Sequence, residues 1–356
     1  MPTWAWAVPA AAIILLIVGL AIEVGVVITV LCVAALVGAV IASVHHAEVI
    51  AHKVGEPFGT LVLAVAVTVI EASLILSMVI VGGADQARLP RDTIYAALMI
   101  ILNGVVGVCL LVGGLRHRVQ SFRVEGSNSG LAALFPLATF SLVLPTFTTT
   151  TRSGTYSGSQ LAFAATASIA LWAVFVFVQT VRHRDYFLPE ADPANPEIHA
   201  EPPSTLETWL SSALLLISLL AVVGLAKVLS PAIERAVVAA GAPKTLIGIA
   251  IAMLVLAPET SAAVRAARAN RLQTSMNLAI GSALASIGLT IPVVAAASVV
   301  FGIPLVLGLD EPKDVVMLAL TFLVSAVTLA TGRTHVMQGA VHVVMFAAFL
   351  FLALVP

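Results

Sequence analysis

The chain has 356 residues, of which 60% are hydrophobic and 10% are charged, and its formal net charge is -1. Its mean hydropathy of +1.10 is far above that of a water-soluble domain of this length. The composition therefore excludes a soluble globular protein and predicts a polytopic membrane protein.

The apolar segments are mostly 17 to 25 residues long, which suits helices crossing a bilayer and is too long for barrel strands. The first segment lacks a basic n-region and a cleavage-like site, so we expect a retained helix rather than a signal peptide. The stretch "FGIPLVLGL", residues 301–309, is compatible with a re-entrant piece or with the end of the ninth helix. The sequence thus predicts an all-α protein of about eleven transmembrane helices, at residues 6–22, 26–44, 57–81, 93–115, 130–146, 160–181, 207–229, 245–264, 273–300, 314–331 and 335–355.

One irregular stretch splits the chain near its middle. Residues 182–208, "RHRDYFLPEADPANPEIHAEPPSTLET", contain five prolines and six acidic residues. The prolines argue against a continuous helix, so we expect a solvated acidic linker at 182–206; the alternative is a surface that attracts cations. The predicted domains are an extra N-terminal helix at 1–25, a five-helix unit at 26–181, this linker, and a second five-helix unit at 207–356.

Lysines and arginines predict the orientation. The connections after even-numbered helices carry ten of them, and those after odd-numbered helices carry seven. Basic residues accumulate on the cytoplasmic side of membrane proteins. We therefore expect a cytoplasmic N-terminus and linker, with the C-terminus outside.

Two glutamates stand inside otherwise apolar helices: Glu71 in "VTVIEASLIL" (67–76) and Glu259 in "VLAPETSAAV" (255–264). An ionisable residue near the bilayer centre costs about 2.5 to 3.5 kcal/mol on insertion scales, which structure alone rarely justifies. Pro258, beside Glu259, predicts a helix break there because proline removes a backbone donor. The alternative is a structural role, in which each glutamate is a neutral, protonated acid that hydrogen-bonds a neighbouring helix.

The glutamate segments also indicate an internal repeat. "AVAVTVIEAS" (64–73) and "AMLVLAPETS" (252–261) share four of ten positions, and each glutamate lies in the second helix of a five-helix group. Because five is odd, the two groups enter the membrane in opposite orientations, as in transporters with inverted repeats and a midplane binding site. The helices that follow carry further polar residues, namely Asn103 in the first group and Asn277, Ser282 and Ser286 in the second.

These residues suggest a chemistry. No lysine or arginine lies within the same helical cores, so the two carboxyls need protons or a bound cation. Hard cations such as Ca2+ prefer carboxylate, carbonyl and hydroxyl oxygens, and protons compete for the same atoms. We therefore expect Glu71 and Glu259 to bind cations and protons in turn, as in an antiporter. A channel lined by the same acids is the alternative, and an intramembrane enzyme is the least favoured, since the sequence lacks a nucleophile or metal motif.

Several other polar or reactive residues have ordinary interpretations. "SVHHAEVIAHKVGEP" (43–57) groups His45, His46, Glu48, His52 and Glu56, which suggests interfacial polar residues or, alternatively, a metal or pH-sensing site. Cys32 and Cys109 fit small core residues. His335 and His342 fit interfacial or packed polar groups.

The motifs resemble a known family. "HHAEVIAHKVGEPFGTLVLAVAVTVIEASLIL", "FVQTVRHRDYFLP" and "LAPETSAAVRAARANRLQTSMNLAIGSALASIGLTIP" are similar to bacterial calcium/proton antiporters of the ChaA type, in the cation/calcium exchanger superfamily. The resemblance spans roughly residues 40–355. It implies an extra first helix plus two inverted five-helix repeats, and a secondary antiporter that is not an enzyme.

The resemblance also assigns roles. The paired cation-binding acids of the family match Glu71 and Glu259, and its supporting polar residues match Asn103 and Ser282, with Ser286 and Asn277 as further candidates. The sequence departs from the better-known exchanger pattern by offering "TVIE" and "LAPE" before the two acids, so Na+ and K+ join Ca2+ as candidate cations.

The resemblance finally implies a cellular location and a set of partners. It indicates a multi-pass protein of the bacterial inner membrane whose partners are the lipid bilayer, inorganic cations and protons, with no cofactor and no nucleic acid. The oligomeric state does not follow from the sequence.

Overall fold

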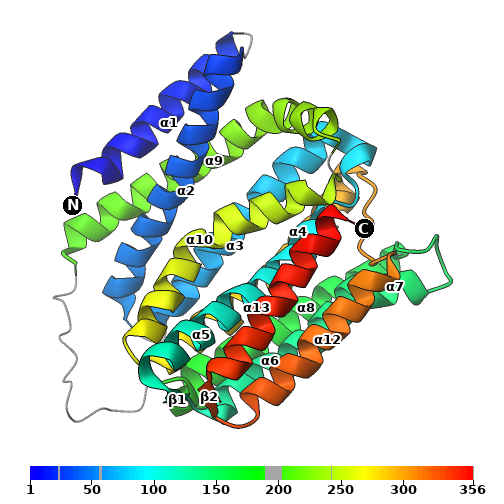
Figure 1. Ribbon diagram of the computed structural model, residues 1–356. Coiled ribbons are helices and arrows are strands. Elements are labelled where there is room, and N and C mark those ends of the chain that lie inside the picture. Colours follow the sequence, from blue (N-terminus) through cyan, green and yellow to red (C-terminus); the bar gives the residue numbers. More distant parts are fainter. Residues whose placement is uncertain (23–24, 56–57, 189–202, 242, 356) are drawn as a thin grey trace.

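The computed structural model describes residues 1–22, 25–55, 58–188, 203–241 and 243–355. These ranges form one bundle of tilted helices (Figure 1). The helices are α1 (Thr3–Ala21), α2 (Val26–Val54), α3 (Phe58–Gly82), α4 (Leu89–Met99), α5 (Val106–His117), α6 (Val124–Ala138), α7 (Leu144–Phe147), α8 (Gly158–Phe177), α9 (Thr205–Ala239), α10 (Thr245–Arg268), α11 (Leu272–Phe301), α12 (Pro312–Leu329) and α13 (Val336–Leu354). The other elements are two 3-10 turns, η1 (Gly83–Gln86) and η5 (Arg184–Phe187), three π-helical stretches, η2 (Ile100–Val105), η3 (Thr139–Val143) and η4 (Val178–Arg182), and two short strands, β1 (Val119–Ser121) and β2 (Arg333–His335).

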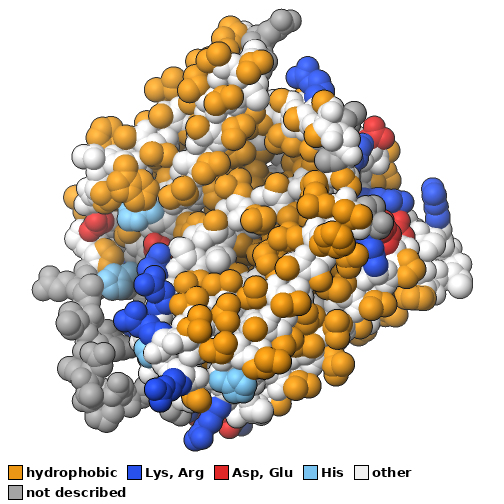
Figure 2. Space-filling view, in the orientation of Figure 1, with side chains coloured by type: hydrophobic (Ala, Val, Ile, Leu, Met, Phe, Trp, Pro, Cys, Tyr) orange, Lys and Arg blue, Asp and Glu red, His pale blue; other side chains and the backbone are white. Residues whose placement is uncertain are grey.

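Eleven helices in the described ranges are long and apolar enough to cross a membrane, which confirms the predicted fold class. Three of these spans contain a π-helical stretch: Leu89–His117, Val124–Phe147 and Gly158–Arg182. The most apolar window of Leu89–His117 is 83% buried, whereas that of Thr3–Ala21 is 17% buried. The fourth span therefore lies at the centre of the bundle and α1 at its edge. Figure 2 shows hydrophobic side chains over the middle of the bundle, with charged ones gathered toward its ends.

One face of the bundle, here called the N-terminal face, carries the N-terminus. The Met1 amino group lies 3.4 Å from a carboxylate oxygen of Glu207, at the start of α9. The strands β1 and β2, which follow the fourth and tenth spans, pair antiparallel on this face. Even-numbered connections therefore meet the N-terminus, as alternate crossing requires.

The opposite face, here called the C-terminal face, collects the odd-numbered connections. Arg88 and Arg91, at the start of the fourth span, form ion pairs with Asp310 at 3.0 and 2.6 Å. Asp310 follows the ninth span, so these contacts join two odd-numbered connections. With eleven spans, the two termini lie on opposite faces.

The segment between α11 and α12 differs from both sequence-based interpretations. Gly302 ends α11 with a φ of +63°, a left-handed conformation that glycine adopts without a steric penalty. The amides of Leu307 and Gly308 then donate to the Gly154 carbonyl at 2.9 and 3.0 Å. Residues 303–309 are therefore an extended connection held by the loop between the fifth and sixth spans, neither re-entrant nor helical.

The two halves of the chain exchange contacts in a reciprocal way. The Glu71 helix, α3, packs against α11, which is the third span of the second half. The Glu259 helix, α10, packs against α4 and α5, which belong to the third span of the first half. This exchange is the arrangement expected from two related five-span units.

The predicted break at Pro258 is wrong. The helix α10 is continuous from Thr245 to Arg268 and contains Pro258 in its interior. The ring still removes one backbone donor, so the carbonyl four residues earlier, on Leu254, lacks its usual partner. The irregular backbone near the centre lies instead in η2, in the adjacent fourth span. The predicted linker 182–206 lies largely outside the described residues, which resume at 203.

Candidate functional site

The two glutamates come from different halves of the chain and converge on one helix. Glu71 lies in α3 and Glu259 in α10, and both are buried, at 3% and 6% relative exposure. Both α3 and α10 contact α11. Both carboxyls are bonded to hydroxyls one helical turn apart on α11, so their charges would repel each other if both were ionised. Burying two acids together is costly unless protons or a cation compensate their charge.

Two serines on α11 hold the two carboxyls. The Ser286 hydroxyl lies 2.8 and 2.7 Å from the two carboxylate oxygens of Glu71. The Ser282 hydroxyl donates to Glu259 at 2.5 Å. Residues four apart on a helix lie on one face, one turn from each other. The helix α11 therefore presents a ladder of two Ser–Glu pairs, referred to below as the serine ladder, in which each glutamate has its own hydroxyl.

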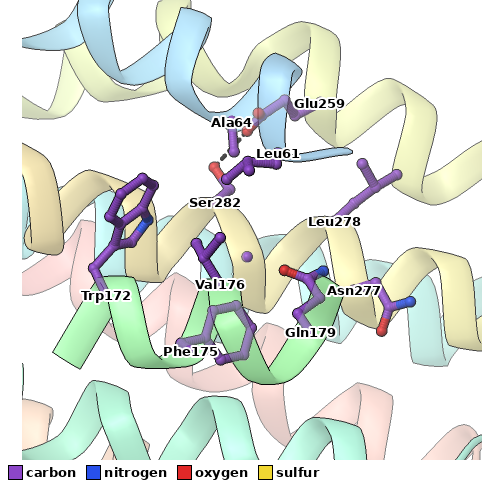
Figure 3. Close-up of a pocket in the computed structure, with 11 residues that line it drawn as sticks. Leu61, Ala64, Trp172, Phe175, Val176, Gln179, Glu259, Asn277, Leu278 and Ser282 are labelled. Atoms are coloured by element: carbon purple, nitrogen blue, oxygen red, sulfur yellow. Dashed lines mark hydrogen bonds between the residues drawn. The ribbon is translucent and has the colours of Figure 1, made fainter. Parts of the chain in front are cut away.

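A pocket reaches one of these pairs. Figure 3 shows that Glu259 and Ser282 border it, and that Gln179 and Asn277 lie further along it. The pocket is bordered by α3, α8 with η4, α10 and α11, and it is lined by Leu61, Ala64, Trp172, Phe175, Val176, Gln179, Glu259, Asn277, Leu278, Gly281 and Ser282.

The position of the pocket along the helices gives its direction. Asn277 is in the second turn of α11, which begins at the N-terminal face, and Leu61 is near the start of α3 on that same face. Glu259 is among the lining residues and Glu71 is not. Glu259 is therefore the first carboxyl met from the N-terminal face, and Glu71 lies one helical turn deeper.

The two predicted asparagines occupy different places. Asn277 lines the pocket, and its amide nitrogen donates to the Phe187 carbonyl at 2.5 Å. Asn103, in η2, is fully buried, but its amide donates to Thr321 at 2.9 Å and its carbonyl pairs with His342 at 3.2 Å. The hydrogen bonds of Asn103 thus run away from the glutamates, and a direct role for it at the carboxyls stays a prediction.

Gln179 is a pocket residue that reasoning from the sequence missed. The residue lies in the π-helical stretch η4 and is 5% exposed, and it lines the same pocket as Glu259. A signal was present, because Gln179 is a polar residue near the end of an apolar span, within the motif "FVQTVRHRDYFLP". It adds a neutral amide to the lining of the pocket that contains Glu259.

The histidines at the end of α2 are not arranged as a metal site. The His46 ring bonds the Ala5 carbonyl at 2.8 Å, and the His45 ring packs on Trp4 with centroids 4.8 Å apart. In the described ranges, no group of three or more His, Cys, Asp or Glu side chains is placed to hold a metal ion. His45 and His46 therefore attach α1 to α2, and the metal interpretation lacks support; Glu56 lies outside the described residues.

The ligand set at the serine ladder fits hard cations. Two carboxylates and two hydroxyls converge there, and amides line the approach. These oxygens suit ions such as Ca2+ or Na+ and also bind protons, whereas the thiols and imidazoles that transition metals prefer are absent from the described lining of the pocket.

Comparison with known proteins decides the family. A family model described as "Sodium/calcium exchanger protein" matches residues 24–181 and 210–355. The chain belongs to the sodium/calcium exchanger protein family. It is 47% identical over 359 residues to the protein y4hA of Sinorhizobium fredii, a match that covers 100% of this chain and 97% of the relative.

Two further comparisons refine this assignment. The chain is 37% identical over 309 residues to the sodium-potassium/proton antiporter ChaA of Escherichia coli, covering 86% of this chain and 83% of ChaA. Its fold matches the crystal structure of the H+/Ca2+ exchanger CAX with a TM-score of 0.75, at 14% identity over 98% of this chain and 87% of that one. The predicted resemblance is thereby confirmed, and this exchanger is a membrane transporter for inorganic cations rather than an enzyme.

Proposed function

We propose that this exchanger is a secondary active antiporter that exports Ca2+ from the cytoplasm in exchange for protons, with Na+ or K+ as further substrates. Glu71 and Glu259 form the shared binding site for cations and protons. The observation that carries the proposal is the serine ladder, which brings one glutamate from each half of the chain onto one face of α11. The relatives add support, since their names include both a sodium-potassium/proton and a Ca(2+)/H(+) antiporter.

The geometry suggests how exchange works. A cation entering from the N-terminal face passes Gln179 and Asn277 and meets Glu259 first. The bound cation displaces the protons from the two carboxyls, because the cation and the protons bind the same carboxylate oxygens. When the site is empty, its two ionised acids make the change from one open face to the other costly. When protons or a cation neutralise the acids, this change is no longer costly. This difference couples the two fluxes.

The arrangement in the membrane is part of the same proposal. We infer that the N-terminal face is cytoplasmic, because the even-numbered connections on it carry the larger number of basic residues. Residues 26–181 and 207–356 then act as two inverted repeats that rock against each other. The bacterial origin of the relatives favours the inner membrane.

Cation/proton exchange in everted membrane vesicles tests the site. Glu71→Gln and Glu259→Gln each keep the shape of the side chain but remove its charge, so we expect each to lower Ca2+/H+ exchange at least about a hundredfold, as expected for loss of a buried charged ligand. Glu125→Gln, at an exposed position at the start of α6, is the matched control and should behave as wild type.

The same vesicles distinguish an antiporter from a channel. An imposed pH gradient should drive Ca2+ uphill in the wild type, and a competition series with Na+ and K+ should give the rank order of the cations. Cation flux without proton counterflow would identify a channel lined by the same acids. Wild-type exchange in both glutamine variants at normal expression would refute the site.

A further inference from the structure

A second buried polar cluster lies in the bundle, apart from the serine ladder. It consists of Asn103 in η2, Thr321 and Thr328 in α12, and His342 in α13. Asn103, Thr321 and His342 are 0% exposed, and Thr328 is 3% exposed. Four buried polar side chains from three spans are costly unless they satisfy one another.

The hydrogen bonds of this cluster form one chain. Thr328 pairs with His342 Nε2 at 3.1 Å, and His342 Nδ1 pairs with the Asn103 carbonyl oxygen at 3.2 Å. The Asn103 amide nitrogen donates to Thr321 at 2.9 Å, and Thr321 lies 3.5 Å from the Met99 sulfur. The chain therefore runs from α12 through α13 and η2 back to α12.

The donors and acceptors in the chain determine the form of the imidazole. The Asn103 oxygen is an acceptor only, so His342 Nδ1 must donate to it. A neutral ring then has a bare Nε2, which accepts the hydroxyl proton of Thr328. His342 thus donates to the Asn103 side chain, and its ring also bonds the backbone carbonyl of Leu102 in the same π turn.

This cluster is connected to the carboxyl site through the backbone of η2. The Val106 amide at the end of η2 bonds to the carbonyls of Ile101 and Asn103 and not to that of Leu102, as a π turn requires. Ile101 and Val105, on either side of Asn103, line a small pocket that also contains Glu259 and Ser282. The register of the π turn therefore decides which apolar side chains lie beside Glu259.

The contact between the fourth span and α13 leaves His342 little freedom. A Cβ placed on Gly107 would lie 2.9 Å from both the His342 Cβ and the Val343 amide nitrogen. The backbones of α5 and α13 therefore approach each other closely at this point. A rigid contact of this kind can hold a π turn, which an isolated helix rarely forms, in a single register.

We propose that His342 is a positioning residue for cation exchange. Through Asn103 it holds the π turn of the fourth span, and so keeps Ile101 and Val105 against the Glu259–Ser282 pair. This inference rests on the proposed function at the serine ladder. His342 itself does not touch the transported ion.

The test measures the half-saturating Ca2+ concentration separately from the maximal exchange rate, in everted vesicles normalised to folded protein. His342→Leu keeps the volume and removes the donor, so we expect the half-saturating concentration to rise about five- to tenfold, the change expected for one buried hydrogen bond. His342→Asn restores an amide donor near the Nδ1 position and should stay within about threefold of wild type.

Thr321→Val supports the result independently, because it removes the acceptor for the Asn103 amide at nearly constant shape. It should raise the half-saturating concentration in the same direction and decides the outcome if His342→Leu does not fold. Thr166→Val, on α8, is the matched control, since its hydroxyl donates to a carbonyl of its own helix.

Two results would overturn the inference. One is a wild-type half-saturating concentration in folded His342→Leu and Thr321→Val proteins. The other is an equal loss in His342→Asn and His342→Leu. Both are distinguishable from failure of the proposed function, which would appear as absent exchange in the wild type or full exchange in Glu259→Gln.

Discussion

At the scale of residues, the central feature is that two serines each bond a different glutamate. Ser282 holds Glu259, which borders the pocket, and Ser286 holds the deeper Glu71. A hydroxyl donor stabilises a buried carboxylate, and its oxygen is also a ligand for a hard cation. In the proposed mechanism, the ladder would therefore favour the ionised form of each acid and supply part of the shell that replaces water around the ion.

Removal of one hydroxyl should weaken cation binding without abolishing exchange. For Ser282→Ala we expect the half-saturating Ca2+ concentration to rise about fivefold, because loss of one hydrogen bond costs about 1 kcal/mol. Ca2+-dependent proton flux in everted vesicles measures it. Ser129→Ala is the control, since that hydroxyl donates to the Glu125 carbonyl within α6. Unchanged affinity in Ser282→Ala would show that the ladder does not contribute to the ion site.

At the scale of elements, the two glutamate helices are alike in course but unequal in backbone. Both α3 and α10 are continuous, yet only α10 carries a proline one residue before its acid. A proline inside a helix costs about 3 kcal/mol relative to alanine. Since α10 keeps that cost beside the site, we infer that the backbone hydrogen bond missing at Pro258 gives α10 a place to bend when the site changes faces.

Pro258→Ala should therefore stabilise the protein and slow its transport. We expect a gain of about 1 to 3 kcal/mol in stability, seen as a higher thermal midpoint in detergent, together with a lower maximal exchange rate. Pro231→Ala, in the interior of α9 and not among the pocket residues, should stabilise without slowing exchange. If Pro258→Ala exchanges at the wild-type rate, the proline serves packing alone.

At the scale of the whole molecule, the two faces are joined differently. On the side of the N-terminal face, a pocket lined by Leu61 and Asn277 reaches Glu259, whereas the C-terminal face carries the ion pairs of Arg88 and Arg91 with Asp310. Arg91 also donates to the Gly308 carbonyl at 3.0 Å. The lining of the pocket therefore lies between Glu259 and the N-terminal face, whereas the ion pairs lie on the opposite face.

The orientation in the membrane can be tested by cysteine labelling, because the two native cysteines are buried. Thr149→Cys is on the C-terminal face and Ser121→Cys is on the N-terminal face, both at exposed positions. In intact spheroplasts, a membrane-impermeant maleimide should label Thr149→Cys, and it should label Ser121→Cys only after lysis. The opposite pattern would reverse the assigned orientation and with it the direction of export.

Many features of this molecule could be predicted from the length of its apolar segments and from the energetic cost of charged residues in the membrane. Long apolar segments predict eleven spans. The free-energy cost of placing Glu71 and Glu259 in those segments singles out the two acids. The helix ends were less predictable: α2 extends ten residues beyond its expected end at 44, and α9 continues through Pro231 to Ala239. In α2 the added turns are partly buried, with His46 and Ala47 covered by neighbouring residues, whereas the described residues from Pro231 to Ala239 of α9 are exposed or half-buried.

What the sequence alone determined is the class of protein, the number of spans and the two acids, because hydrophobic length and the cost of a buried charge are local properties. Only the tertiary structure decided which side chains meet. It placed Ser282 on Glu259 and Ser286 on Glu71, turned Asn103 toward His342, and brought Gln179 to the pocket. Such partners depend on how distant helices rotate and cross, and on π turns that shift the facing side chains, none of which the spacing within a single helix records.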